Sequence, residues 1–179
     1  MPFKVRFDIY ESGKGAPCYS GHNRELAYIE LEDLRNKNGY LKYSMKCDIT
    51  LADLTKPEKY VWLVYQVRQA INRYYSERKH VTPEQSLENL QASLTLEKQL
   101  DDWNTRTRCY INSHPKASHG DEKDFSFFLI VEEWRTLWHK YFAYKKLSNK
   151  DQAVQHEMYK QCRDFEKQID NYVKQVIGL

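Results

Sequence analysis

An aromatic-rich segment near the middle of the chain constrains the fold more than any other stretch. It runs from Asp124 to Leu147, and its large apolar side chains recur at three- and four-residue spacings: Phe127, Ile130, Val131, Trp134, Leu137, Trp138, Tyr141, Phe142 and Tyr144. A surface helix normally has an apolar stripe only ~100° wide, whereas these positions cover more than half of a helix circumference. We therefore predict a helix over 124–147 that is central in the molecule and contacts neighbours on several sides.

The first part of the chain has the period of β-strands. Apolar and polar residues alternate over 3–10 and again over 40–51, as they do in half-buried strands. Apolar residues indicate a further strand over 26–32, and the turn signal at 37–39 predicts a hairpin between the last two strands. The glycine-containing stretch 11–22 is typical of a flexible loop. We expect a three-stranded antiparallel sheet with one polar face.

After Leu54 the apolar period becomes that of helices. Four helices are predicted, over about 57–78, 83–110, 124–147 and 149–177. Thr55 and Thr82 are each followed three residues later by Glu58 and Gln85, the pattern of a capping box at a helix start. Ser148 is the expected cap of the last helix.

The expected fold class is therefore α+β, with an N-terminal antiparallel sheet over 1–54 followed by a four-helix, mainly antiparallel bundle over 55–179. The sheet and the helices form either two units or one compact domain. If there are two units, we expect the hinge at 79–82.

Apolar runs in the chain are short, such as that from Phe127 to Val131. That length predicts neither a secretory signal nor a membrane-spanning helix, so we expect a cytoplasmic protein without membrane contact. The four cysteines lie far apart without a CxxC pair and are expected to be reduced thiols: Cys18, Cys47, Cys109 and Cys162.

A C-x4-H-x4-H spacing lies between two predicted helices and suggests a weak metal site. Its candidate ligands are Cys109, His114, His119 and Asp121, with His156 as a more distant alternative. The spacing partly resembles a zinc knuckle, but Arg106 occupies the place of the paired cysteine. The alternative is a solvated polar loop, so no cofactor is expected and zinc is the open possibility.

Motifs for nucleophilic catalysis are missing, since the chain has neither a G-x-S-x-G elbow nor a glycine-rich phosphate loop. Arg73 and His80 form an R-x6-H spacing that resembles the arginine-histidine motif of the HEPN ribonucleases, in which a dimeric helical bundle brings both residues to an RNA phosphate. Tyr74 stands where that family usually has a polar residue. The alternative is a basic helix end that complements the helix dipole. We expect a protein without catalytic activity.

Basic residues cluster at two places in the sequence. Six of them are candidate nucleic-acid ligands, in the predicted hairpin and at the end of the following helix: Lys37, Lys42, Lys46, Arg73, Arg78 and Lys79. The order of a three-stranded sheet and a helix also resembles the arm-binding domain of tyrosine recombinases. The formal net charge of +3 is too small to indicate nucleic acid by itself, and solvated lysines on an exposed sheet face are the alternative.

Two functions are compatible with these sequence features. The first is a non-catalytic interaction module that binds a protein partner, or itself as a homo-oligomer, through an aromatic-rich helical surface. The second is a nucleic-acid-binding protein, acting as an accessory or RNA-processing factor through the basic hairpin face and the helix ends.

Overall fold

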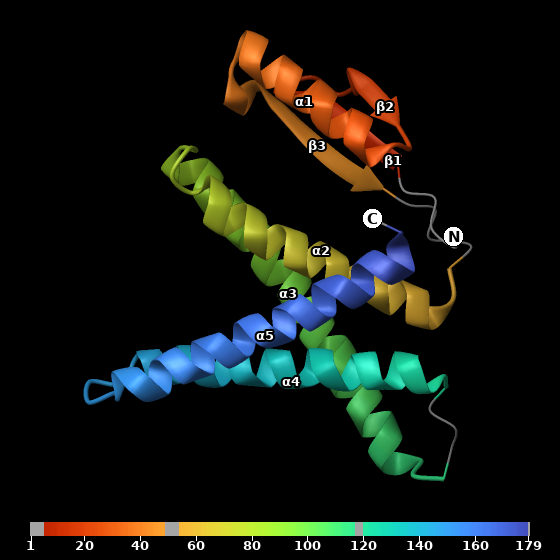
Figure 1. Ribbon diagram of the computed structural model, residues 1–179, viewed down its shortest axis with the longest axis vertical. Helices are drawn as coiled ribbons and strands as arrows, with labels where there is room; N and C mark the ends of the chain where they lie inside the picture. The colour runs from red at the N-terminus through yellow and green to blue at the C-terminus, as the bar shows by residue number, and fades with distance from the viewer. Residues whose placement is uncertain (1–5, 49–53, 117–119, 179) are drawn as a thin grey trace.

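The computed structural model describes residues 6–48, 54–116 and 120–178. Figure 1 shows a small sheet with one helix packed against it, and four longer helices that form the rest of the molecule. The elements are β1 Arg6–Glu11, β2 Tyr19–Gly21, α1 Arg24–Asn38, the short 3₁₀ turn η1 Tyr40–Lys42, β3 Tyr43–Asp48, α2 Lys56–Glu77, α3 Pro83–Ser113, α4 Glu122–Lys145 and α5 Gln152–Ile177. The α+β class is confirmed.

The sheet has the strand order β2-β1-β3, and both pairings of β1 are antiparallel. Ile9 of the central strand pairs with Tyr19 on one side and with Met45 on the other. The three-stranded antiparallel sheet is thus confirmed, but its second strand was predicted wrongly. That strand lies at Tyr19–Gly21, inside the stretch that we predicted as a loop.

The segment predicted as the strand 26–32 is part of helix α1. Ala27 and Leu31 are buried four residues apart on one helix face, and Asn23 caps the helix by accepting a hydrogen bond from the backbone of Leu26. The helical spacing of these buried residues outweighs the alternation on which the strand was based. No hairpin therefore joins 26–32 to 40–51, and Gly39 ends α1 instead, with a φ of 104° that favours glycine.

The third strand is shorter than predicted, because residues 40–42 form the η1 turn and β3 begins at Tyr43. Lys42 and Lys46 therefore do not share one strand face, contrary to the expectation of a basic hairpin face. Residues 3–5 and 49–51 of the predicted strands lie outside the described residues.

The caps predicted for α2 and α3 are confirmed, whereas the one predicted for α5 is wrong. Both capping boxes are present: Thr55 and Glu58 cap α2, and Thr82 and Gln85 cap α3. The cap of α5 is Asp151, whose carboxylate accepts hydrogen bonds from the next turn, and not Ser148. The described residues contain five helices where four were predicted, since α1 replaces a strand.

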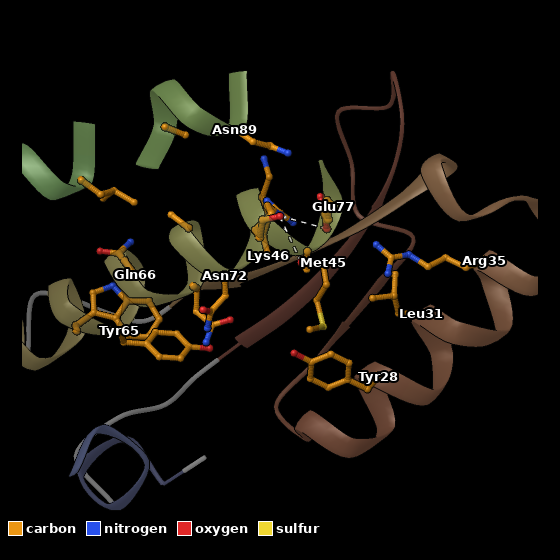
Figure 2. A pocket seen from close by; sticks show the side chains of 17 residues that line it. Tyr28, Leu31, Arg35, Met45, Lys46, Tyr65, Gln66, Asn72, Glu77 and Asn89 are labelled. Carbon is orange, nitrogen blue, oxygen red and sulfur yellow. Dashed lines mark hydrogen bonds and ion pairs between the residues drawn. The ribbon is translucent and has the colours of Figure 1, made fainter. Parts of the chain in front are cut away.

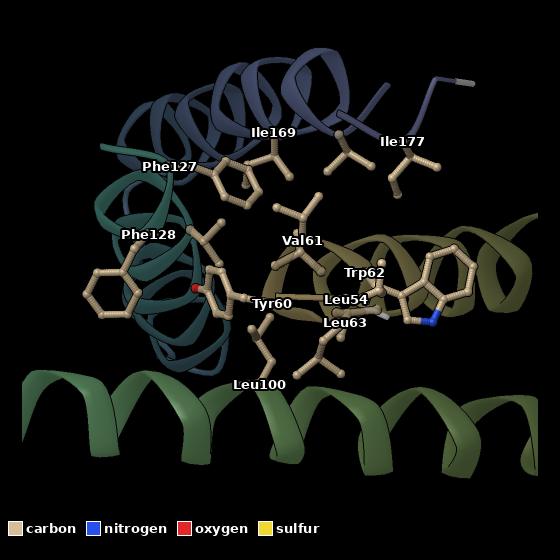
Figure 3. Packing of buried hydrophobic residues seen from close by; sticks show 14 of the residues in the cluster. Leu54, Tyr60, Val61, Trp62, Leu63, Leu100, Phe127, Phe128, Ile169 and Ile177 are labelled. Atoms are coloured by element: carbon tan, nitrogen blue, oxygen red, sulfur yellow. The ribbon is translucent and has the colours of Figure 1, made fainter. Parts of the chain in front are cut away.

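Helix α2 is enclosed by its neighbours over its first half, where every residue from Tyr60 to Val64 is buried. Figure 3 shows α2 between α3 on one side and α4 and α5 on the other. The predicted helix over 124–147 forms, and Trp134 is completely buried. At its far end, however, Phe142 is 42% exposed and stacks on Trp138, which lies on the same helix. The aromatic helix is therefore buried on one face as far as Tyr141, and its last turn is partly exposed.

The sheet and the helices share buried residues. Phe7 of β1 and Ala27 of α1 belong to the same apolar cluster as α2, α4 and α5, and a second cluster of Ile9, Leu31 and Tyr43 lies between α1 and the sheet. Within the described ranges, no helix combines the length and apolar character needed to cross a membrane.

Candidate nucleic-acid interface

Two basic segments that lie far apart in the sequence meet at one end of the molecule. The ring of Tyr40, in η1, lies 6.2 Å from the ring of His80, in the turn between α2 and α3. Figure 1 shows this end, where the end of α1 approaches the α2–α3 turn. We call this surface the basic-aromatic end and define it as Arg35, Lys37, Tyr40, Lys42, Tyr75, Arg78, Lys79 and His80.

Two tyrosine rings of the basic-aromatic end each lie beside an arginine. The guanidinium of Arg35 lies 4.0 Å from the centre of the Tyr40 ring, and that of Arg78 lies 5.3 Å from the Tyr75 ring. Arg35 also donates two hydrogen bonds to the backbone oxygen of Tyr43, which hold its side chain in place. Because Tyr40 and Tyr75 remain 49% and 48% exposed, their rings retain accessible surface.

Carboxylates neutralise some of these cations. Lys42 lies 3.3 Å from Glu11, and hydrogen bonds from Lys14 and Lys42, together with their charges, lower the pKa of the Glu11 carboxyl below its ordinary value. Within the described part of the chain, no ion pair involves Lys37, Arg78 or Lys79. These three remain available to an external anion.

A cleft of about 560 Å³ opens beside the basic-aromatic end, between α1 and β3 on one side and α2 and α3 on the other. Figure 2 shows Arg35 and Met45 facing Tyr65 and Asn72 across it. Its cations are Arg35, Lys46 and Arg73, and its uncharged polar groups include the carboxamides of Gln66, Gln69, Asn72 and Asn89. We call this feature the amide cleft.

The six candidate nucleic-acid ligands are thus divided between two adjoining features. Lys37, Lys42, Arg78 and Lys79 lie on the basic-aromatic end, whereas Lys46 and Arg73 line the amide cleft. Arg35 belongs to both.

Arg73 and His80, the pair that resembles the HEPN motif, have different neighbours. Arg73 lies 3.6 Å from Glu77, and His80 contacts Tyr40. Arg135 and His139, on α4, do approach each other at 3.5 Å. Arg135, however, is buried and hydrogen-bonded to Glu97 and Asp101, so its guanidinium is not accessible to a phosphate.

The weak metal candidates have local structural contacts. His114 ends α3 and stacks on Tyr110 at 4.3 Å, and Asp121 caps α4 by accepting a hydrogen bond from Lys123. Cys109 is exposed on α3, and His119 lies outside the described residues. Among the residues that the structure describes, no three His, Cys, Asp or Glu side chains are grouped closely enough to hold a metal ion.

Sequence reasoning did not select Tyr40, Tyr75 or the carboxamides of the amide cleft. The predicted strand over 26–32 placed Arg35 and Tyr40 in a hairpin and made no link between this hairpin and the α2–α3 turn. Recognising 24–38 as a helix would have changed that placement, but no local pattern indicates that this helix ends beside His80.

No protein-family model, no curated protein and no solved structure matches this chain.

Proposed function

We propose that this protein binds single-stranded nucleic acid through the basic-aromatic end. The observation that supports this most is the contact between Tyr40 and His80, because it joins the cations of the α1–β3 connection to those of the α2–α3 turn on one surface. Each segment alone offers fewer cations to a phosphate backbone than the two together. Together they present cations from two elements of the fold.

Exposed tyrosines favour a single strand over a duplex. A single strand exposes base faces that stack on aromatic rings, and one such stack contributes ~1–3 kcal/mol, whereas the bases of a duplex are stacked on one another. Tyr40 and Tyr75 each present a ring beside an arginine. Each pair of ring and cation can thus contact one base and a neighbouring phosphate.

Fluorescence anisotropy with a labelled single strand of roughly 12 nucleotides, at two salt concentrations, tests the proposal. The triple variant Lys37→Gln, Arg78→Gln, Lys79→Gln should bind more weakly. The slope of log K against log salt should fall by about 2, since each phosphate contact on a single strand contributes ~0.7.

A matched control removes three exposed lysines remote from this end: Lys98→Gln, Lys123→Gln and Lys174→Gln. The control has the same net charge as the triple variant, so it should retain the wild-type slope if the site is local. Equal loss in both variants would mean that only the overall charge matters, and no binding at low salt would refute the proposal.

A second candidate function, binding of a protein partner, is favoured by a separate surface on α4 and α5. At the tip of this helical pair four large apolar side chains are each at least 42% exposed: Phe142, Leu147, Val154 and Tyr159. Single exposed apolar residues are ordinary, but a contiguous group is typical of an interaction site. Tyr159 lies 5.9 Å from Tyr141, which is 5.5 Å from Phe142, so the aromatic members are continuous.

Self-association is the simplest form of this second function. Sedimentation equilibrium should show an oligomer that Phe142→Ser together with Tyr159→Ser dissociates, while Leu87→Ser, an exposed apolar residue on α3, leaves it unchanged. A wild-type monomer at all concentrations would exclude a homo-oligomer.

A further inference from the structure

We propose that the amide cleft accepts a base of the bound strand and discriminates between bases. The inference rests on the proposed binding of single-stranded nucleic acid, and it assigns to this cleft the recognition that the basic-aromatic end alone cannot provide. Stacking on exposed tyrosines tolerates every base, because all bases have an aromatic face.

The position of the amide cleft supports a role in base recognition, since Arg35 belongs both to the cleft and to the basic-aromatic end. Its guanidinium covers the Tyr40 ring at 4.0 Å, and its side chain also lines the amide cleft. A strand whose backbone lies along the basic-aromatic end therefore passes the mouth of the cleft. One of its bases can turn inward while its phosphate stays near Arg35.

The carboxamides of the cleft match the edge of a base better than they match a phosphate. Four carboxamides line it, and each offers both donors and an acceptor, as base edges do, whereas a phosphate needs donors only. Among the described residues, none of these carboxamides has a hydrogen-bonding partner: Gln66, Gln69, Asn72 and Asn89. Figure 2 shows Asn72 on α2 and Asn89 on α3, so the groups come from two elements.

Two tyrosines in the lining of the cleft fit an aromatic ring. Tyr28 and Tyr65 provide ring surfaces, and the Tyr65 ring centre lies 5.1 Å from that of buried Trp62. Glu77 can accept hydrogen bonds from an exocyclic amino group, as carboxylates do from cytosine. The volume of about 560 Å³ is within the range of small-molecule sites.

The affinities of the protein for strands of different bases test this role directly. We would compare the affinities of oligodeoxyadenylate, oligodeoxycytidylate and oligodeoxythymidylate of equal length, at one salt concentration. The wild-type protein should prefer one of them by about tenfold, within the discrimination expected of a good bidentate contact.

Filling the cleft should abolish that preference. Ala92 is exposed on α3 and lines the cleft, so Ala92→Trp places a ring inside it, whereas Gln91→Trp adds the same ring at the neighbouring exposed position, which does not line the cleft. Ala92→Trp should bind all three strands alike with unchanged salt dependence, and Gln91→Trp should keep the wild-type preference. If Ala92→Trp fails to fold, as judged by its melting curve, the double variant Asn72→Ala, Asn89→Ala replaces it with the same expectation.

The outcomes separate this inference from the function on which it rests. Equal, salt-dependent affinity of the wild-type protein for all three strands would overturn base discrimination and leave nucleic-acid binding intact. A preference that survives in the cleft variants would place the discrimination elsewhere and also overturn it. No binding of any strand at low salt would refute both.

Discussion

The guanidinium of Arg68 donates two hydrogen bonds of 3.0 Å each to the carboxylate of Asp170, and this pair joins α2 to α5. Arg68 is 4% exposed and also lies 3.3 Å from Glu166, which is 2% exposed. The ring of Trp134 lies 5.7 Å from the same guanidinium. A charged group is therefore built into the contact between α2, α4 and α5.

Replacing Arg68 should destabilise the protein strongly. Arg68→Met leaves the carboxylate of Glu166 buried with fewer partners, and removing one member of a buried ion pair typically costs ~3–5 kcal/mol. Urea unfolding measures this difference. Lys167→Met is the control, because Lys167 forms an exposed pair with Asp164 and such pairs contribute only ~0–1 kcal/mol. Equal losses in both variants would contradict the prediction.

Trp134 should be among the largest single contributors to the core. It is completely buried, and truncating a buried aromatic residue typically costs ~3–5 kcal/mol, so Trp134→Ala should lose that much free energy of unfolding. Phe142→Ala, on the exposed end of the same helix, should lose less than about 1 kcal/mol. A loss below about 1 kcal/mol for Trp134→Ala would mean that α4 packs less tightly than the buried Trp134 implies.

Asp101 should make the free energy of unfolding fall at acidic pH. Burial raises the pKa of its carboxyl, but hydrogen bonds and charge from Arg135 and His139 outweigh burial and hold the pKa below its ordinary value of 3.8. The folded protein thus binds this proton less readily than the unfolded chain does. The contribution of Asp101 is present above pH 3.8 and is lost as pH falls through the lowered folded-state pKa.

The comparison with Asp101→Asn isolates this effect. Urea midpoints of the two proteins should differ clearly at about pH 6, with the wild type more stable, and the difference should shrink as pH falls below 3.8 toward the lowered folded-state pKa. A difference that stays constant over this range would show that the carboxylate charge contributes nothing to folding.

Cys162 should react more slowly than Cys18 and Cys109. Its side chain is completely buried, and burial, with the nearby charge of Glu166, raises the pKa of the thiol to about 11. Cys18 and Cys109 are exposed. Since the thiolate is the reactive form, iodoacetamide at about pH 8 should modify Cys162 at least about tenfold more slowly than the other two. Peptide mapping by mass spectrometry measures the three rates, and comparable rates would contradict the buried position.

Local hydrogen bonds made some helix starts predictable. The capping boxes at Thr55 and Thr82 depend on groups three residues apart, so the sequence alone specified them. The wrong prediction of a strand at 26–32 arises because this segment depends on contacts with distant residues. That segment contains apolar residues compatible with both periods, and only burial against the sheet shows which of them face inward.

The sequence by itself determined the α+β class, the first and third strands of the antiparallel sheet and the positions of α2, α3, α4 and α5 to within a few residues, because apolar periodicity and capping act over one or two helical turns. Only the tertiary structure decided which basic residues lie together. The contact between Tyr40 and His80 depends on how α1 and the sheet pack beside α2 and α3. That packing results from many buried contacts between distant segments, which no local pattern encodes.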